Sequence, residues 1–169
     1  MNIIVTGGAG FIGSHVVRLL LASGAHVLTL DNLSYAANRA ALGEFARHDH
    51  HQFMQVDLRN AAALPPIFEN FKPDAVMHLA AESHVDRSID GPHPFIETNI
   101  IGTFNLLEAA RTYWHERARH ASPNTFRFHH VSTDEVYGTL GQTGCFTENT
   151  AYAPHSPYAA SKASSDHLV

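Results

Sequence analysis

The sequence predicts an α/β fold, a doubly wound parallel sheet with helices on both faces. Short apolar runs alternate with longer segments whose apolar residues recur at helical spacing. The first run leads straight into a glycine cluster, and the second and third runs end at Asp31 and Asp57. Because alternating strands and helices build parallel sheets with right-handed crossovers, we expect the strand order 3-2-1-4-5.

Five short apolar runs are expected to form the strands. The first run is buried and ends at the glycines, and the second ends at Asp31. The last run contains His129 and His130, whose side chains should point to opposite faces of the sheet. In chain order, the strands are expected at 2–6, 26–30, 52–56, 74–79 and 126–132.

Four segments have the periodicity of helices. The first stops at Gly24, and the second is entered through Pro65 and Pro66. The third aligns Ile100 and Phe104 along one face. In chain order, the helices are expected at 11–22, 62–70, 95–111 and 157–169.

The last predicted helix is not followed by a sixth strand. We therefore expect a sheet that is truncated before that strand and before a substrate-binding domain. The fifth strand would then be an exposed edge, which is prone to pair with other chains. The connection expected to be most flexible covers residues 118–124.

The composition is that of an ordinary globular protein. Apolar residues make up 44%, and a net charge of -5 argues against nucleic acid as a partner. No apolar run approaches the roughly 20 residues of a membrane span, and Met1–Thr6 is too short for a signal peptide. The single cysteine, Cys145, fits a cytoplasmic location. The 14 histidines lack metal-binding spacing, so no metal is expected.

A GxGxxG pattern at Gly8, Gly10 and Gly13 lies between the first strand and the first helix. This context is typical of a dinucleotide-binding turn, because glycines let backbone N–H groups approach a pyrophosphate closely. The positive end of the helix dipole adds attraction for the phosphates. The sequence therefore predicts a Rossmann domain.

The acidic residue at the end of the second strand predicts the cofactor. Asp31 lies 31 − 13 = 18 residues after Gly13, the position that hydrogen-bonds an adenosine ribose. Its carboxylate would repel a 2′-phosphate by about 4 kcal/mol at 4 Å and an effective dielectric of 20, which favours NAD over NADP. Asp57, after the third strand, is expected either at the adenine edge or as an ordinary turn residue.

Tyr158 and Lys162 form a YxxxK pair, which a helix places on one face. A free tyrosine titrates near pH ~10, so work as a base near neutrality needs a shift of roughly 3 units, about 4 kcal/mol. A lysine cation a few ångströms away supplies energy of that order. The pair following a dinucleotide fingerprint predicts a catalytic tyrosine.

Three further stretches narrow the family. They are 79–88 after the fourth strand, 131–138 after the fifth and 152–158 before the last helix. With the glycine turn and the YxxxK pair, they resemble the extended short-chain dehydrogenase/reductase family, and within it the dTDP-glucose 4,6-dehydratase family. The resemblance covers the whole chain. Ala37 and His155 depart from the pattern of the family, but neither is a reacting group.

The resemblance implies an NAD site and a substrate site. It implies that Ser83 and Thr133 contact the substrate, whereas a salt bridge in an ordinary loop explains His84, Asp86 and Arg87 equally well. The residues expected to hold NAD are Gly7, Gly10, Phe11, Ile12, Gly13, Asp31, Asn32, Leu33, Ser34, Asp57, Leu58, Leu79, Ala80, Ala81, Glu82, Ser83, Thr98, Tyr158 and Lys162.

The resemblance also implies that Thr133, Asp134 and Glu135 are catalytic with Tyr158 and Lys162. Asp134 would be the general acid of a dehydration and Glu135 the general base. Neighbouring carboxyls push their pKa values apart, so that one can stay protonated. Adjacent residues of a strand face opposite ways, so both can face a substrate only if the strand ends before them. The alternative is an acidic pair in a cap or turn.

The activity implied is the dehydration of dTDP-glucose to dTDP-4-keto-6-deoxyglucose, with transient oxidation at C4, loss of water across C5 and C6, and hydride return. Residues 1–169 would be the NAD-binding domain of a homodimeric lyase, with the substrate-binding domain outside them and little activity by themselves. Two alternatives stay open. A nucleotide-sugar 4-epimerase would lack the Asp134-Glu135 pair. The chain could also be a catalytically incomplete NAD-binding module.

Overall fold

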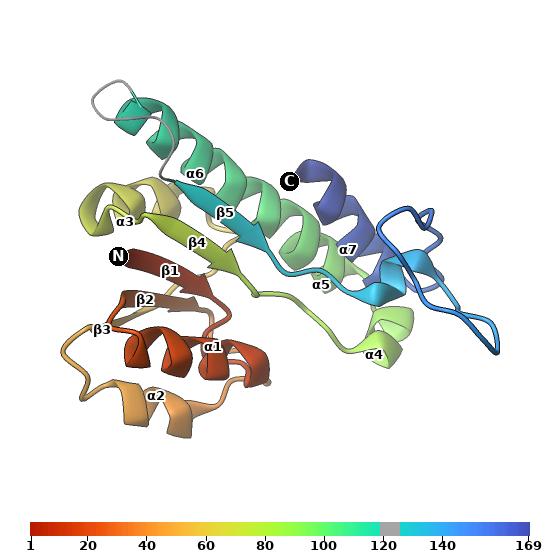
Figure 1. The fold of residues 1–169 in the computed structure, drawn as a ribbon, viewed down its shortest axis with the longest axis horizontal. Helices are drawn as coiled ribbons and strands as arrows, with labels where there is room; N and C mark the ends of the chain where they lie inside the picture. Colours follow the sequence, from red (N-terminus) through yellow and green to blue (C-terminus); the bar gives the residue numbers. More distant parts are fainter. Residues whose placement is uncertain (119–125) are drawn as a thin grey trace.

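The computed structural model describes residues 1–118 and 126–169, and these form a five-stranded parallel sheet (Figure 1). The strands lie in the order β3-β2-β1-β4-β5, so the predicted order is confirmed. The observed ends differ from the predicted ones by at most two residues. The strands are β1 Asn2–Thr6, β2 His26–Asp31, β3 His51–Gln55, β4 Ala75–His78 and β5 Arg127–His130.

The central strand β1 is buried on both faces. It pairs with β2 on one side and with β4 on the other, with Ile3 opposite both Val27 and Ala75. Its side chains alternate between two apolar cores, so that Ile3 and Val5 enter one core and Ile4 enters the other. A strand covered on both faces needs apolar residues at every position, which explains the continuous apolar run.

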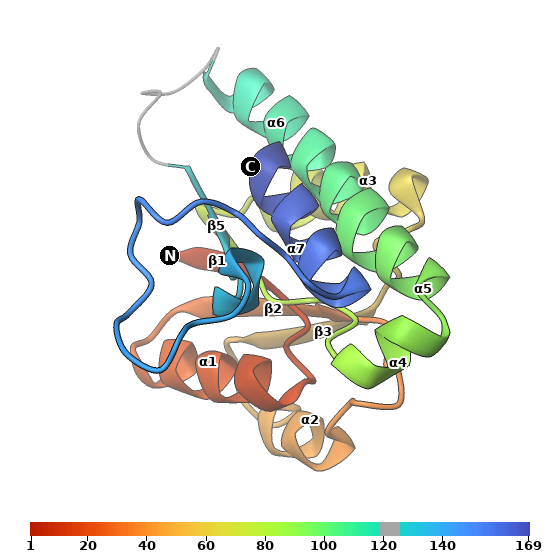
Figure 2. The ribbon, with the colours of Figure 1, turned by 90° about the vertical axis from the view of Figure 1, so that its right-hand side faces the viewer.

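Helices form a layer on each face of the sheet (Figures 1 and 2). On one face α1 (Phe11–Ala22) and α2 (Arg39–Phe45) contribute Val17 and Phe45 to the core. On the other face α3 (Leu64–Phe71) and α6 (Thr103–Ala118) contribute Phe68 and Leu106. The last helix, α7 (Pro157–Leu168), lies beside α6 in Figure 2. The predicted doubly wound fold is confirmed.

The long helix differs from its prediction in length and in geometry. The prediction was 95–111, but the helical segment starts with α5 (His93–Phe95) and ends with α6. Between them lies η2 (Ile96–Gly102), a π-helical turn, which contains an extra residue per turn. Ile96, Ile100 and Phe104 follow one another at intervals of four residues, which is ordinary α-helical spacing. Periodicity therefore could not show the π-helical turn.

Two short helices were missed in segments expected to be loops. Asn38 caps α2, because its side chain accepts a hydrogen bond from the Ala41 N–H, and asparagine at this position is a helix-start signal. The helix α4 (Val85–Asp90) has no such side-chain cap. The helix predicted at 62–70 consists of two parts. A 3-10 turn, η1, spans Ala61–Ala63 and is followed by α3.

The connection at 118–124, expected to be flexible, lies outside the described residues except for the last residue of α6. Within the described ranges β5 is one end of the sheet, as predicted. No helix of residues 1–118 or 126–169 combines the length and the apolarity that crossing a bilayer requires.

We predict that Leu106→Ala lowers the free energy of unfolding by about 2–5 kcal/mol, because it empties a fully buried site. The matched control is Leu19→Ala, at a helix position that is 71% exposed. It should change the free energy by less than about 0.5 kcal/mol. Urea denaturation of the whole protein measures both values, and equal losses would contradict the described core.

Candidate active site

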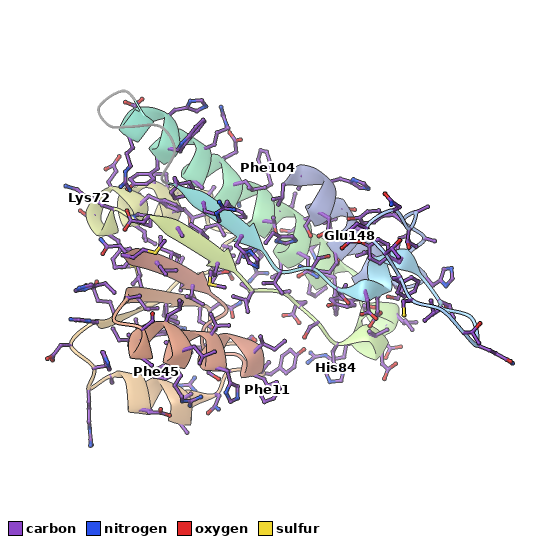
Figure 3. The ribbon with its side chains drawn as sticks, in the orientation of Figure 1. Phe11, Phe45, Lys72, His84, Phe104 and Glu148 are labelled. Atoms are coloured by element: carbon purple, nitrogen blue, oxygen red, sulfur yellow. The ribbon has the colours of Figure 1, made fainter. Side chains whose placement is uncertain are left out.

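A cleft of about 370 Å³ opens at the carboxyl end of the sheet. Its walls come from the turn after β1, the segments after the other strands, and the start of α7. In Figure 3, Phe11 at the start of α1 and His84 before α4 lie at this end of the sheet, whereas Lys72 lies at the opposite end. The carboxyl edge of an open α/β sheet is where ligands of such folds bind.

The turn after β1 can exist only with glycine. Gly7 has φ +69°, and a Cβ there would lie 2.7 Å from the Ala80 backbone nitrogen. A Cβ on Gly13 would collide with the carbonyl oxygen of Gly7. Gly10 precedes α1 with no side chain to cap it, and the first turn of α1 has no acidic residue. The N–H groups of this first turn are therefore free to bind an anion.

The Asp31 carboxylate is fixed in the wall of the cleft. One oxygen accepts a hydrogen bond from the Ala9 N–H at 3.0 Å, and the other accepts one from the Leu33 N–H at 2.8 Å. The side chain lines the cleft, although the residue is only 8% exposed. A negative charge is thus held rigidly beside the glycine turn, where a ribose hydroxyl could donate to it.

Asp57 has a partner of its own in the cleft wall. Its carboxylate accepts hydrogen bonds from the backbone N–H and the guanidinium of Arg59, with an Nη2–Oδ2 distance of 2.6 Å. Arg59 holds the pKa of Asp57 below its ordinary value. Asp57 therefore forms a turn and also lines the cleft, and its place at the adenine edge stays a prediction.

The structure brings together all but one of the residues predicted to hold the cofactor. The exception is Leu33, which does not line the cleft and instead gives its N–H to Asp31. Those that line it are Gly7, Gly10, Phe11, Ile12, Gly13, Asp31, Asn32, Ser34, Asp57, Leu58, Leu79, Ala80, Ala81, Glu82, Ser83, Thr98, Tyr158 and Lys162.

Sequence reasoning missed several residues of the cleft. Leu30 and Val56 are the last residues of predicted strands, and Val131 is the last but one of the fifth, so their position at the carboxyl edge was a usable signal. Ala36 and Ala37 belong to the segment between β2 and α2, and no sequence signal marked them. The remaining addition is Ser132.

Lys162 is buried and points away from solvent. Only 4% of the residue is exposed. Its ammonium donates to the Val131 carbonyl oxygen at 2.7 Å and lies 3.4 Å from Nε2 of His130. Burial lowers the pKa of Lys162 to about 8. The cation is thus anchored to the segment after β5, on the floor of the cleft.

Tyr158 behaves differently from the expectation. Burial raises its pKa above the ordinary value, a hydrogen bond with Thr133 opposes this, and the charges of Glu135 and Asp134 add to the rise. Lys162 is not among the causes. The expected lowering of the tyrosine pKa by Lys162 is therefore wrong for the chain alone, because the ammonium is directed at a backbone carbonyl.

The acidic pair lies on a short turn after β5. The strand ends at His130, and the 3-10 turn η3 spans Asp134–Tyr137. Thr133 caps this turn by accepting a hydrogen bond from the Glu135 N–H at 3.3 Å. The condition that the strand ends before the pair is therefore met. The pair also occupies a capped turn, so the structural alternative describes its backbone correctly without deciding its chemistry.

A second hollow lies beside η3. Thr133 and Asp134 line it, whereas Glu135 lines neither of these two hollows. At its base, Asp166 of α7 accepts hydrogen bonds from the hydroxyls of Ser132 at 2.5 Å and Tyr152 at 3.1 Å. Nε2 of His130 lies 3.1 Å from the other oxygen of Asp166, and burial lowers the pKa of His130 to about 4. These polar contacts connect α7 to the end of β5 and to the segments before and after η3.

The reading of His84, Asp86 and Arg87 as a salt bridge in an ordinary loop is wrong, because Asp86 and Arg87 belong to α4 and no ion pair joins the three within the described residues. Arg87 belongs to α4, and its guanidinium carbon lies 3.9 Å from the ring centroid of Tyr35. The Tyr35 hydroxyl donates to the carboxylate of Glu82 at 3.4 Å. Ser83 and His84 are exposed at the same end of the sheet. In residues 1–118 and 126–169, no three His, Cys, Asp or Glu side chains gather as a metal ion requires.

Comparison with known proteins shows to which family the chain belongs. Residues 4–169 match the family model described as GDP-mannose 4,6 dehydratase. The chain belongs to this family. It is similar to the dTDP-glucose 4,6-dehydratase of Neisseria meningitidis serogroup B, with 58% identity over 170 residues that make up 99% of this chain and 48% of the relative. The predicted resemblance is confirmed.

Solved structures of the family share the fold. DesIV, a dTDP-glucose 4,6-dehydratase from Streptomyces venezuelae with NAD and TYD bound, has a TM-score of 0.87 and 45% identity over 99% of this chain and 50% of its own. The UDP-glucose 4-epimerase of Thermus thermophilus in complex with NAD has a TM-score of 0.84 and 37% identity over 99% and 49%. The chain spans about half the length of the curated relatives that it matches.

We predict that the buried Lys162 makes stability depend on pH. Because its pKa falls from 10.5 to about 8 on folding, the unfolded chain binds more protons between these values. The free energy of unfolding should therefore rise with pH from about 8 to 10.5. Lys162→Met should flatten this rise, and Lys72→Met, at an exposed lysine, should keep it. Denaturant titrations of the whole protein across this range give the slopes, and equal slopes in the two variants would refute the assignment.

Proposed function

We propose that the protein carrying this chain is an NAD-dependent dTDP-glucose 4,6-dehydratase, a lyase that forms dTDP-4-keto-6-deoxyglucose. One observation carries the proposal. The capped turn with Asp134 and Glu135 stands beside Tyr158, at the edge of a cleft built for a dinucleotide. The names of the curated relatives support the same reaction.

The cleft suits NAD in its shape and its charge. The glycine turn offers a close approach that a Cβ at Gly7 would block, and the uncapped start of α1 offers N–H groups to a pyrophosphate. The fixed carboxylate of Asp31 suits a ribose with a free 2′-hydroxyl. When bound, NAD would supply hydride uptake from the sugar C4, hydride return to C6, and a positive charge that favours the Tyr158 phenolate.

Tyr158, Thr133 and Lys162 would handle the proton at the C4 hydroxyl. Tyr158 lines the cleft, and the nearby Thr133 lowers its pKa, so both hydroxyls could meet the same group of the sugar. The phenolate form of Tyr158 would take the C4 hydroxyl proton. Lys162, fixed by its bond to Val131, would hold its ammonium near the cofactor ribose.

The acidic pair would then remove water. A ketone at C4 makes the C5 proton acidic, and Glu135 would accept that proton. Asp134 would donate a proton to the C6 hydroxyl, so that the C6–O bond breaks and water leaves. When hydride returns to C6, Glu135 would give its proton back to C5, which completes the 4-keto-6-deoxy sugar. General acid–base groups are effective when they are held near the reacting atoms. The 3-10 turn holds both side chains beside Tyr158, whose pKa both carboxylates raise.

We propose residues 1–169 as the NAD-binding domain that also carries the catalytic groups. Ser83 is exposed at the edge of the cleft and, with Thr133, would contact the sugar. The nucleotide half of the substrate would be held by residues outside this range. This proposal agrees with the greater length of the curated relatives.

A homodimer is part of the proposal. Apolar side chains of η2, α6 and α7 expose 40% or more of their surface, namely Ile96, Ile101, Phe104 and Leu168. A second copy of the chain would cover such residues. A cytoplasmic location is proposed too, because a reducing compartment keeps the exposed thiol of Cys145 free.

A 4-epimerase is the second candidate, since the Thermus thermophilus structure is nearly as similar. An epimerase has no water to eliminate and needs no pair such as Asp134 and Glu135. The products separate the two activities. Incubation of the whole protein with dTDP-glucose and NAD should give a 4-keto sugar, and a 4-epimer without keto product would favour the epimerase. NAD binding without either product would leave an incomplete module.

We predict that Asp31→Asn weakens the preference for NAD over NADP by about tenfold or more, because it removes the charge that repels a 2′-phosphate. Asparagine keeps one acceptor oxygen for the neighbouring N–H groups. Asp49→Asn, at an exposed aspartate, is the control and should leave the ratio unchanged. Binding constants for both dinucleotides measure the effect, and an unaltered ratio in Asp31→Asn would exclude this role.

We predict that Asp134→Asn and Glu135→Gln each slow formation of the 4-keto-6-deoxy sugar about a hundredfold or more, the usual contribution of general acid–base groups. Oxidation at C4 does not need them, so NADH absorbance should build up when dTDP-glucose is added. Asp90→Asn and Glu69→Gln, at exposed carboxylates, are the controls. Full dehydration in either catalytic variant would refute the assignment.

A further inference from the structure

His78 is a fully buried histidine at the end of β4, and the proposed chemistry does not use it. Only 1% of the residue is exposed. Its Nδ1 lies 2.6 Å from the hydroxyl of Thr6 on β1, and its Nε2 lies 2.8 Å from the hydroxyl of Thr103 on α6. The ring thus joins the central strand to the long helix on one face of the sheet.

The neighbouring hydrogen bonds determine which nitrogen carries the proton. The Thr6 hydroxyl oxygen already accepts from the N–H groups of Leu79 and Ala80, each at 3.2 Å. Its single hydrogen is therefore free to donate to Nδ1 of His78. The Thr103 hydroxyl donates to the Asn99 carbonyl oxygen at 2.7 Å, so it must accept from Nε2–H. Only the neutral Nε2–H tautomer satisfies every partner.

The charges around the ring favour the same neutral state. Burial lowers the pKa of His78 well below its ordinary value. His130 on β5 and Lys162 on α7 are the titratable groups that act on it, and a positive charge on either lowers the pKa further. The His130 ring lies 5.2 Å from the His78 ring between centroids. A second proton would also leave the Thr6 hydrogen without an acceptor.

Both ends of this hydrogen-bond chain reach the segment after β4 that lines the cofactor cleft. At one end the Thr6 hydroxyl holds the N–H groups of Leu79 and Ala80, and both residues line the cleft. Ala80 is also the residue against which Gly7 packs without room for a Cβ. At the other end, Asn99 bonds to the backbone of Glu82.

Asn99 continues the chain to the catalytic helix. Its side-chain amide donates to the hydroxyl of Ser161 at 2.9 Å, and that hydroxyl donates to the carbonyl oxygen of Tyr158 at 2.7 Å. Asn99 stands in the π-helical turn η2, and Thr103 begins the helix that follows. The ring of His78 is therefore part of a chain of hydrogen bonds from the end of β1 to α7.

We propose that His78, locked as the Nε2–H tautomer, is a positioning residue for the dinucleotide. By accepting the Thr6 hydrogen at Nδ1, the ring turns the Thr6 hydroxyl oxygen toward the N–H groups of Leu79 and Ala80. The proposal deepens the proposed function, since it takes NAD as the ligand of the cleft. It requires that loss of the acceptor at Nδ1 weakens NAD binding, although His78 itself does not line the cleft.

Variants of the ring separate its two hydrogen bonds. His78→Asn keeps an acceptor near the position of Nδ1, and His78→Gln keeps only a donor near Nε2. His78→Phe keeps the ring and loses both bonds. Measured by calorimetry on the whole protein, NAD should bind to His78→Asn within about threefold of the unchanged protein, and about tenfold more weakly to the other two. Melting temperatures are recorded alongside. Equal NAD affinity in all three folded variants would overturn the proposal.

A pair of threonine variants covers the case in which ring variants do not fold. Thr103→Val leaves the ring in place but removes the acceptor that fixes its tautomer, and it should weaken NAD binding. The control is Thr29→Val, which removes a hydroxyl that is also fully buried and also bonded to a histidine, His51. It should lower the melting temperature with little change in NAD affinity. Equal effects of the two on affinity would overturn the proposal.

The tautomer can be tested without any ligand. Nitrogen-15 spectra of histidine-labelled whole protein, assigned by comparison with His78→Asn, should show a protonated Nε2 and an unprotonated Nδ1 from pH ~5 to ~8, the range in which an ordinary histidine titrates. A protonated Nδ1, or titration in this range, would refute the arrangement. Failure of the unchanged protein to bind NAD would instead refute the proposed function, and the spectra keep these two failures distinct.

Discussion

The contact between the glycine turn and the backbone after β4 is the constraint on which the site depends. A Cβ on Gly7 would lie 2.7 Å from the Ala80 nitrogen, so two neighbouring strands can end this close together only without a side chain there. The contact lies in the lining of the cleft, together with the end of β2, the segment after β3 and the start of α7. It also explains why a polar group as deep as the Thr6 hydroxyl has several partners, since each N–H next to the contact must be satisfied without water.

Burial determines the charge state of most polar groups near the cleft. It lowers the pKa of Lys162 and His130 and raises that of Tyr158. The Asp31 side chain, in contrast, accepts hydrogen bonds from two backbone N–H groups. The interior therefore keeps histidine and tyrosine neutral and fixes a carboxylate at the rim.

The order of the sheet could be predicted from the alternation of apolar runs and helical segments, whereas most of the cleft lining was expected from the resemblance to the dehydratase family. Leu30 and Val56 were missed although they stand where apolar runs stop, whereas Ala36 and Ala37 carry no signal. The pKa of Tyr158 could not be predicted, because spacing places a lysine four residues away without saying where its ammonium points. It points to a backbone carbonyl, a direction that only the packing of α7 on the segment after β5 determines.

The π-helical turn η2 also fixes the number of residues in this part of the helix. One residue turns an α-helix by about 100°, so a helix that contains one extra residue presents everything after it on a different side. Deletion of a single residue from Ile96–Gly102 would restore a regular helix, yet it would rotate either Asn99 or the whole of α6 away from its partners. Insertions and deletions here should therefore be as rare as changes of the buried residues, although much of the turn faces outward.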